Sequence, residues 1–250
     1  MTLQFAMLLA AVTGDPVLDR NFPDPELTYI VMNVRTREVI ASRWENADTA
    51  IPVGSLVKPF LALAFDGAFP DFTCHGKEDR CWLDRGHGAI DFREALANSC
   101  NAYFLNLAGR VDAHALEVVA SRYEIPPPGS TSAATRIGLG EGWKISPAAL
   151  LRAYVELSAR RSDPKVADIL TGLDLAAERG TARALGRGVL AKTGTAACVA
   201  RRRHAGDGFT VVLDPAESPR IALFIRVHGV PGAEAAKTAA RMLRMLRTGR

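Results

Sequence analysis

Strand-forming segments lie near both ends of this chain, and helix-forming segments lie between them. Residues 29–34 and 38–42 are rich in β-branched and apolar side chains and flank a polar turn, which predicts a β-hairpin. Three similar segments, at 189–199, 208–213 and 220–227, predict an antiparallel meander. The simplest arrangement is one antiparallel sheet built from the N- and C-terminal strands, flanked by helices, with an inserted helical lobe. We therefore predict an α/β fold.

Helical patterns fill the middle of the chain and return at its end. We predict helices over 54–69, 91–108, 114–123 and 147–160. The second of these begins at Asp91, a plausible N-cap with Glu94 three residues later. Residues 71–88 are polar and are predicted to form a loop. A final helix over 233–247 would cover the sheet with one apolar face, formed by Ala236, Ala239, Ala240, Leu243 and Leu246.

Composition excludes several classes of protein. The chain has 250 residues, 48% of them apolar and 23% charged, which excludes collagen-like, coiled-coil and disordered proteins. The 31 Lys and Arg residues exceed the 27 Asp and Glu residues by only four. A nucleic-acid-binding protein usually carries a clustered basic face, and the dense basic run here is short, at 201–204. We therefore expect no nucleic-acid partner.

The first residues leave two interpretations open. Residues 3–12 are apolar, too short to span a bilayer, and similar in length to the core of a signal peptide. No Lys or Arg precedes them, so an export signal and a buried first helix both remain possible. Prolines within 21–25 predict a linker. We divide the chain into a leader or linker segment, 1–26, and a single domain, 27–250, and expect no transmembrane anchor.

A serine and a lysine stand one helical turn apart at the start of the first predicted helix. Ser55 and Lys58 would lie on the same helix face, which brings an amine within reach of a hydroxyl. A serine hydroxyl is a weak nucleophile until a neighbouring base takes its proton, and a desolvated lysine can be that base. The S-x-x-K pattern also occurs by chance, because Ser162 and Lys165 repeat it in a polar Asp-Pro stretch where we expect no catalysis.

Two further polar groups interrupt apolar patterns. Ser99 and Asn101 can both face a cleft if they lie in a turn, although serine and asparagine are also common at helix ends. The predicted core strand over 189–199 contains Lys192, Thr193, Gly194 and Thr195. A glycine destabilises such a strand unless a ligand or another backbone approaches closely. An edge strand of this kind could pair with an extended substrate while its lysine and hydroxyls attract a carboxylate. A surface-exposed strand end remains the alternative.

The three motifs S-x-x-K, S-x-N and K-T-G, in this order, are the signature of the penicillin-recognising serine enzymes. The sequence resembles one branch of them, the transpeptidase domain of class B penicillin-binding proteins. The resemblance extends from about residue 27 to residue 230. It is carried by the segments 54–60, 80–88, 95–104, 137–147, 191–196 and 214–220.

This resemblance implies acyl transfer on a D-Ala-D-Ala stem peptide of peptidoglycan, as a DD-transpeptidase or DD-carboxypeptidase that β-lactams acylate. Ser55 would be the acylated nucleophile and Lys58 its base. Ser99 would carry the proton towards the leaving group. Backbone N–H groups of Ser55 and Thr195 would form the oxyanion hole.

The resemblance also implies the groups that bind substrate. Asn101 would bind the substrate amide, and Lys192 would set the local electrostatic potential as part of the catalytic set. Thr193 and Thr195 would contact the terminal carboxylate, and Gly194 would let the substrate backbone approach. The partners would be a peptidoglycan stem peptide or a β-lactam, outside the cytoplasm in the periplasm or cell envelope. No cofactor is implied.

Departures from the family pattern leave other functions open. The family usually carries a membrane anchor and an N-terminal pedestal domain, and neither fits before residue 27. Class D serine β-lactamases use a similar triplet of motifs without a pedestal, so hydrolysis of β-lactams is the main alternative. A third possibility is a penicillin-binding sensor module that is acylated without turnover.

Cysteines leave a separate question open. Cys74 and Cys81 could form a disulfide in an exported protein or remain free thiols, and His75 and His87 nearby would make a loose metal-like cluster. Their C-x6-C spacing differs from that of a standard zinc site, so we expect no metal site. Cys100, between Ser99 and Asn101, is expected to serve packing.

Overall fold

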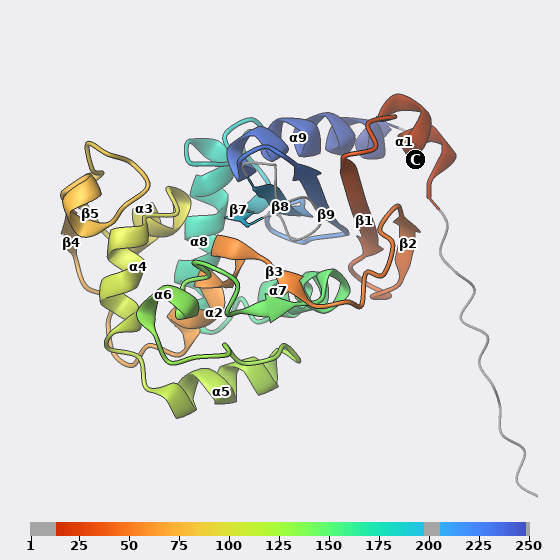
Figure 1. The fold of residues 1–250 in the computed structure, drawn as a ribbon. Coiled ribbons are helices and arrows are strands. Elements are labelled where there is room, and N and C mark those ends of the chain that lie inside the picture. Colours follow the sequence, from red (N-terminus) through yellow and green to blue (C-terminus); the bar gives the residue numbers. More distant parts are fainter. Residues whose placement is uncertain (1–13, 198–205, 249–250) are drawn as a thin grey trace, which may run out of the picture.

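A five-stranded antiparallel sheet forms the centre of the computed structural model, which describes residues 14–197 and 206–248 (Figure 1). Its strand order is β2-β1-β9-β8-β7. The strands are β1 (Leu27–Asn33), β2 (Val39–Ser42), β7 (Leu190–Ala196), β8 (Asp207–Asp214) and β9 (Ile221–His228). The hairpin, the meander and the antiparallel sheet built from both chain ends are therefore confirmed.

The two ends of the chain meet where β1 pairs with β9. Their register runs from Leu27 opposite Val227 to Asn33 opposite Ile221. Side chains alternate across a strand, and both faces of β1 are buried: Tyr29 joins one apolar core and Ile30 joins the other. The sheet thus separates two cores, one under the C-terminal helix and one shared with the helical lobe.

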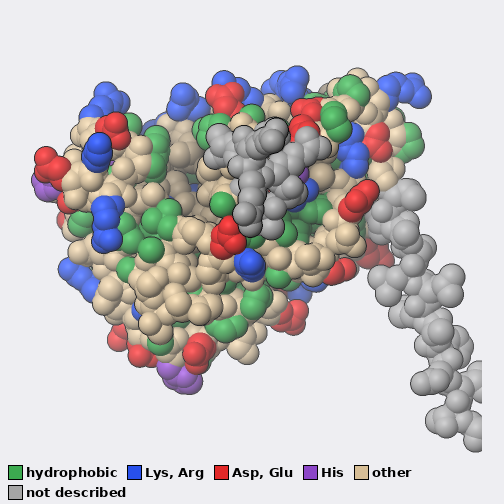
Figure 2. Space-filling model, in the orientation of Figure 1, with side chains coloured by type: hydrophobic (Ala, Val, Ile, Leu, Met, Phe, Trp, Pro, Cys, Tyr) green, Lys and Arg blue, Asp and Glu red, His purple; other side chains and the backbone are tan. Residues whose placement is uncertain are grey.

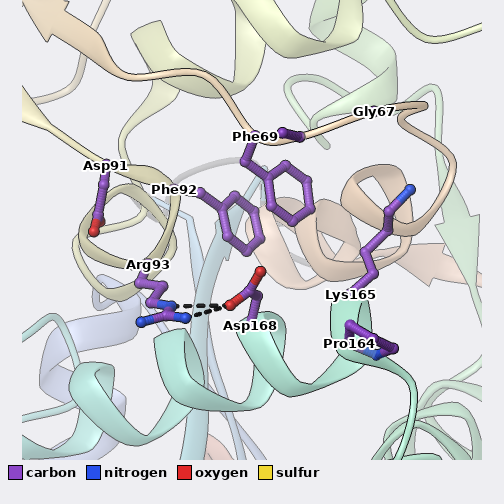
Figure 3. A pocket seen from close by; sticks show the side chains of 9 residues that line it. Gly67, Phe69, Asp91, Phe92, Arg93, Pro164, Lys165 and Asp168 are labelled. Carbon is purple, nitrogen blue, oxygen red and sulfur yellow. Dashed lines mark hydrogen bonds and ion pairs between the residues drawn. The ribbon is translucent and has the colours of Figure 1, made fainter.

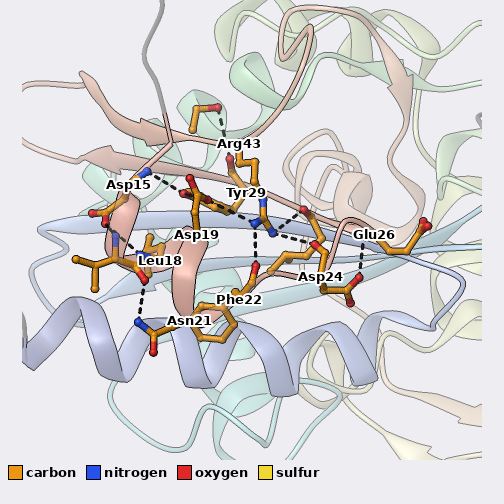
Figure 4. Close-up of polar contacts among 12 residues, drawn as sticks. Asp15, Leu18, Asp19, Asn21, Phe22, Asp24, Glu26, Tyr29 and Arg43 are labelled. Carbon is orange, nitrogen blue, oxygen red and sulfur yellow. Dashed lines mark hydrogen bonds and ion pairs between the residues drawn. The ribbon is translucent and has the colours of Figure 1, made fainter.

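Helix α9 (Gly232–Thr248) covers the first of these faces, and the short helix α1 (Pro16–Asn21) lies beside it (Figure 1). Every residue of the predicted apolar face of α9 is buried, from Ala236 to Leu246. Helix α1 was not predicted. The Asp15 carboxylate caps it, and the Tyr29 hydroxyl donates a hydrogen bond to Asp19 (Figure 4). Arg43 donates to backbone carbonyls that follow α1, including that of Phe22.

The helical lobe packs against the other face of the sheet. Its helices are α2 (Lys58–Leu63), α3 (Phe92–Ala97), α4 (Asn101–Ala108), α5 (Ala113–Arg122), α6 (Ala133–Arg136), α7 (Pro147–Ala159) and α8 (Pro164–Glu178), with 3-10 turns η1 (Gly54–Val57) and η2 (Gly76–Asp79). Two small sheets complete it: β3 (Ile51–Pro52) with β6 (Lys144–Ile145), and β4 (Phe72–Cys74) with β5 (Gly88–Ile90). Helix α8 packs on both α3 and β7, so it joins the lobe to the sheet.

Four sequence expectations for the lobe need correction. The helix predicted over 54–69 is instead the 3-10 turn η1 followed by α2, which ends at Leu63. The single helix predicted over 91–108 is two helices, because Ser99 has a φ of 52° that ends the first one. Asp91 does cap α3, accepting a hydrogen bond from the Glu94 N–H. Helix α8 was missed, although Asp163 caps it and Pro164 occupies its first turn. The loop predicted over 71–88 contains short strands at its two ends.

Acidic and basic side chains are interspersed on the face of the described residues that Figure 2 shows. This mixture agrees with the nearly balanced composition. None of the described helices is both long enough and apolar enough to span a membrane. The apolar run at 3–12 and the basic run at 201–204 lie outside the described residues.

Candidate active site

Residues of all three motifs line one cleft of about 250 Å³ where the helical lobe meets the edge of the sheet. The motif residues on its wall are Ser55, Ser99, Asn101, Thr193, Gly194 and Thr195. Lys58 and Lys192 lie directly behind this wall and are fully buried. The structure therefore brings together every residue that the sequence analysis assigned to the site.

Close backbone contacts hold the nucleophile turn η1 against its neighbours. Gly54 has a φ of +60°, and a Cβ atom there would lie 2.3 Å from the carbonyl oxygen of Thr195. Gly138 has a φ of +82°, and a Cβ atom there would lie 2.1 Å from the Gly54 carbonyl oxygen. Glycine is required at both positions because only glycine permits this backbone conformation and this approach. Gly138 thus buttresses the turn that carries Ser55.

A buried hydrogen bond fixes the same turn from the side of α7. The Tyr154 hydroxyl donates to the Leu56 carbonyl oxygen at 2.7 Å, and the tyrosine ring packs on Phe60. We expect Tyr154→Phe to lower the free energy of unfolding by about 1–3 kcal/mol, because a buried carbonyl loses its donor. Urea unfolding monitored by circular dichroism measures this change.

The matched control for this substitution is Tyr123→Phe. Tyr123 is also buried against Phe60, but its hydroxyl makes no hydrogen bond among the described residues. We expect a smaller loss of stability in this control. Equal losses in the two variants would contradict a specific contribution from the Tyr154 hydroxyl.

The break between α3 and α4 presents the second motif. Ser99 takes a left-handed conformation, and Cys100 caps α4 with its sulfur accepting from the Tyr103 N–H at 3.5 Å. This conformation brings three acceptors to the Lys58 amine. They are the carbonyl oxygen of Ser99, its hydroxyl and the side-chain oxygen of Asn101. Lys58 Nζ donates to Ser99 O at 2.8 Å, to Asn101 Oδ1 at 2.7 Å and to Ser99 Oγ at 3.3 Å.

The third motif lies on β7, which is the edge strand of the sheet. Lys192 Nζ donates to Ser99 Oγ at 2.9 Å and to the carbonyl oxygen of Thr193 at 2.8 Å. The Ser99 hydroxyl therefore lies between the two lysine amines. The Thr195 side chain faces the cleft and accepts a hydrogen bond from the Gly232 N–H, at the start of α9.

Burial dominates the electrostatics of both amines. Burial lowers the pKa of Lys58 to about 7, although the nearby thiols of Cys100 and Cys81 partly oppose the change. Burial also lowers the pKa of Lys192 well below its ordinary value, and the charge of Lys58 lowers it further. A neutral amine can accept a proton, so this site can hold a general base next to a serine.

Ser55 lies half-buried at the wall of the cleft, one turn before Lys58. Its hydroxyl makes no hydrogen bond to the described residues, because the Lys58 amine is engaged by the second motif. Catalytic hydrogen bonds often tighten only when substrate is bound. The accessible Ser55 hydroxyl thus lies in front of the buried amines of Lys58 and Lys192. The Ser99 hydroxyl bridges these two amines.

Sequence reasoning missed several residues of this cleft. Thr181, in the turn after α8, donates to the Ala97 carbonyl and accepts from the Thr193 hydroxyl at 2.7 Å. Trp82 is 53% exposed at the rim, and its indole N–H donates to the Ser99 carbonyl. Leu139, between Gly138 and Gly140, also lines the cleft. Trp82 and Leu139 lie in the segments 80–88 and 137–147 that carry the family resemblance, but their exposure at the cleft is visible only in the structure, and Thr181 lies in no such segment.

The second S-x-x-K copy lies elsewhere. Ser162 precedes α8, and Lys165 in its first turn lines a different cleft of about 440 Å³ (Figure 3). Its amine donates to the Phe65 carbonyl. The stacked rings of Phe69 and Phe92 form the floor of that cleft. The two copies therefore differ in tertiary environment, since only the first lies beside the other motifs.

The family model for the penicillin-binding protein transpeptidase domain matches residues 27–246. The chain belongs to this family. Penicillin-binding transpeptidase domains act on peptidoglycan outside the cytoplasm, and the resemblance inferred from the motifs is confirmed. A comparison with curated proteins finds no match.

Solved structures of penicillin-binding proteins share the fold. The chain is similar to Pseudomonas aeruginosa PBP2 in complex with WCK 5153, at a TM-score of 0.73, 19% identity and coverage of 87% of this chain and 70% of that one. It is also similar to PBP2 from Helicobacter pylori, at a TM-score of 0.77, 17% identity and coverage of 94% and 63%. The same Helicobacter protein in complex with MreC matches at a TM-score of 0.76 and 18% identity, with coverage of 92% and 62%. The transpeptidase domain described here thus spans less than two thirds of the Helicobacter chains.

Proposed function

We propose that this chain is a serine acyl-transferase that acts on D-Ala-D-Ala stem peptides of peptidoglycan and is acylated by β-lactams through Ser55. The observation that carries the proposal is the convergence of the three motifs on one cleft, with both Lys58 and Lys192 hydrogen-bonded to the Ser99 hydroxyl. An accessible serine near a buried amine whose pKa is lowered to about 7 is the arrangement that nucleophilic acyl transfer needs.

The proposed acylation step begins with attack of Ser55 Oγ on the carbonyl carbon of the D-Ala-D-Ala peptide bond. The hydroxyl proton passes to Lys58. Backbone N–H groups of Ser55 and Thr195 stabilise the oxyanion of the tetrahedral intermediate, a contribution of about 3–4 kcal/mol per donor in enzymes of this kind. The C–N bond then breaks, and the leaving D-Ala amine takes the proton from Lys58 through the Ser99 hydroxyl, which Lys192 holds by a hydrogen bond.

Substrate recognition falls to the groups on the cleft wall. The Asn101 side chain binds the amide of the stem peptide, and Thr193 and Thr195 bind its terminal carboxylate. The substrate backbone extends along β7, whose outer edge is unpaired within the described sheet. A Cβ atom at Gly194 would lie 2.7 Å from the Val53 carbonyl oxygen, so this glycine lets β7 approach the turn that carries Ser55 rather than making room for substrate. We place this reaction outside the cytoplasm, in the periplasm or cell envelope, where peptidoglycan is found.

The lifetime of the acyl-enzyme tests this function against the hydrolase. After a pulse of penicillin, intact-mass spectrometry is expected to show one adduct per chain that persists for hours, because a transpeptidase or carboxypeptidase deacylates β-lactam esters slowly. Loss of the adduct within seconds would instead identify a β-lactamase of the class D type. Absence of any adduct would contradict acylation through Ser55.

The nature of the acyl acceptor needs a second measurement. Incubation with a pentapeptide stem is expected to release D-Ala, with a cross-linked product when an amine acceptor is added. Release without cross-linking identifies a carboxypeptidase. A persistent penicillin adduct with neither product would favour the non-turnover sensor module and contradict the proposed transferase.

A further inference from the structure

Three cysteines and one histidine come together behind the second motif. They are Cys74 at the end of β4, Cys81 after η2, His87 before β5, and Cys100 at the start of α4. Their ligand atoms all lie within 4.8 Å of one another. None of these side chains has a part in the proposed acyl transfer. In the described structure the three cysteines are free thiols, so Cys74 and Cys81 do not form a disulfide.

Three of the six distances between these atoms match those of a tetrahedral metal site, and the others are at most 4.8 Å. His87 Nδ1 lies 3.6 Å from the sulfur of Cys74 and 3.6 Å from that of Cys81. The sulfurs of Cys81 and Cys100 are 3.8 Å apart. Around a tetrahedral Zn²⁺ with ordinary bond lengths, sulfur and nitrogen would be about 3.6 Å apart and two sulfurs about 3.8 Å apart.

A backbone donor and a helix N-terminus lie beside one sulfur of the cluster. The Cys100 sulfur accepts a hydrogen bond from the Tyr103 N–H at the start of α4, where the helix dipole favours negative charge. Thiolates are the form in which cysteine binds metal.

The segment that carries three of the four side chains has almost no apolar core of its own. Between residues 73 and 89, a fully described stretch, the buried residues are Cys74, Cys81 and two glycines. Backbone hydrogen bonds such as that from the Cys81 N–H to the Gly76 carbonyl close the loop, but they bury little surface. A small segment without a core commonly folds around a metal ion, whose binding free energy replaces that of a core.

We propose that Cys74, Cys81, His87 and Cys100 bind one structural Zn²⁺ ion that fastens the segment 74–90 to the start of α4 and thereby positions Ser99 and Asn101. Three sulfurs and one imidazole nitrogen complete a four-coordinate site, as in structural zinc centres. Binding converts the three thiols to thiolates and releases their protons to solvent. Cys100 lies between Ser99 and Asn101, so the ion would restrain the two residues that receive the Lys58 amine.

The spacing of these residues in the sequence did not predict a metal site. The C-x6-C interval matches no standard zinc motif, and Cys81, His87 and Cys100 lie outside the helices and strands. His75, which the sequence placed in a loose cluster with His87, instead lies outside it and pairs with Asp79 at 3.1 Å. The sequence expectation that no metal binds is therefore replaced by this proposal.

Metal binding can be measured without any acylation assay. The purified full chain, reduced and free of metal, is titrated with Co²⁺ and then with Zn²⁺. We expect one equivalent of Co²⁺ to give thiolate-to-metal charge-transfer bands with the intense d–d absorption of a tetrahedral site, and one equivalent of Zn²⁺ to abolish them. Elemental analysis should then find one zinc per chain.

Variants assign the ligands. Cys74→Ser and His87→Ala are each expected to weaken Zn²⁺ binding by more than the roughly 10- to 100-fold that loss of an outer-shell partner costs. His75→Ala is the matched control and should bind as the wild type does. The proposal is wrong if the reduced wild type binds less than one equivalent or if His87→Ala keeps the cobalt spectrum.

The positioning role has its own readout. Removal of zinc from the wild type with a chelator should slow acylation by penicillin, and re-addition should restore the rate, while Cys74→Ser should show no response to either treatment. Unchanged acylation after verified loss of the ion would contradict positioning and leave a purely structural site. Because cobalt and zinc binding are measured directly, a failure of the proposed acyl transfer would not be mistaken for a failure of this proposal.

Discussion

Ser55→Ala is expected to abolish covalent labelling by penicillin, because no oxygen remains at the cleft wall to form the acyl ester. Ser55 is half-buried and makes no hydrogen bond to the described residues, so its replacement should change the free energy of unfolding by less than about 0.5 kcal/mol. Gel fluorescence with a labelled penicillin measures the adduct, and thermal unfolding measures the stability. A folded Ser55→Ala variant that still forms an adduct would disprove the assignment of the nucleophile.

The chain supplies its own control for this substitution. Ser162 occupies the same position in the second S-x-x-K copy, which lies at the start of α8 and faces a different cleft. Ser162→Ala should label at the rate of the wild type. The pair of variants therefore separates the tertiary site from the sequence motif.

Lys58→Met is expected to slow acylation by roughly 10²- to 10⁴-fold, the usual contribution of a general base. The substitution keeps an unbranched chain in a fully buried position and removes only the amine that contacts Ser99 and Asn101. The variant should therefore fold, although Asn101 Oδ1 loses its donor, which costs some stability. Stopped-flow measurement of the second-order acylation rate constant gives the effect.

Lys165→Met is the matched control for Lys58→Met, because Lys165 is the lysine of the second S-x-x-K copy and lines the other cleft. Its acylation rate should equal that of the wild type. If Lys58→Met is folded and its acylation rate constant falls by less than 10-fold, another group acts as the base. Lys192 would then be the first candidate, because its amine also donates to the Ser99 hydroxyl.

Local patterns in the sequence determined much of the fold. Alternation and turn residues located all five strands of the central sheet, and the apolar positions of the last helix placed its buried face from Ala236 to Leu246. The pattern failed where one residue changes the backbone: the left-handed conformation of Ser99 divides the helix predicted over 91–108. Helix α8 was missed because its start, at Asp163 and Pro164, lies in a polar stretch typical of a loop.

The motif order S-x-x-K, S-x-N, K-T-G identifies the family from local residue types and so predicts which residues carry the chemistry. What these residues contact follows from the tertiary structure alone. It placed Ser99 between the amines of Lys58 and Lys192, and gathered Cys74, Cys81, His87 and Cys100 into one cluster. Such contacts join residues that are far apart in the chain. They depend on how separate elements pack against one another, and periodicity within one element does not record that packing.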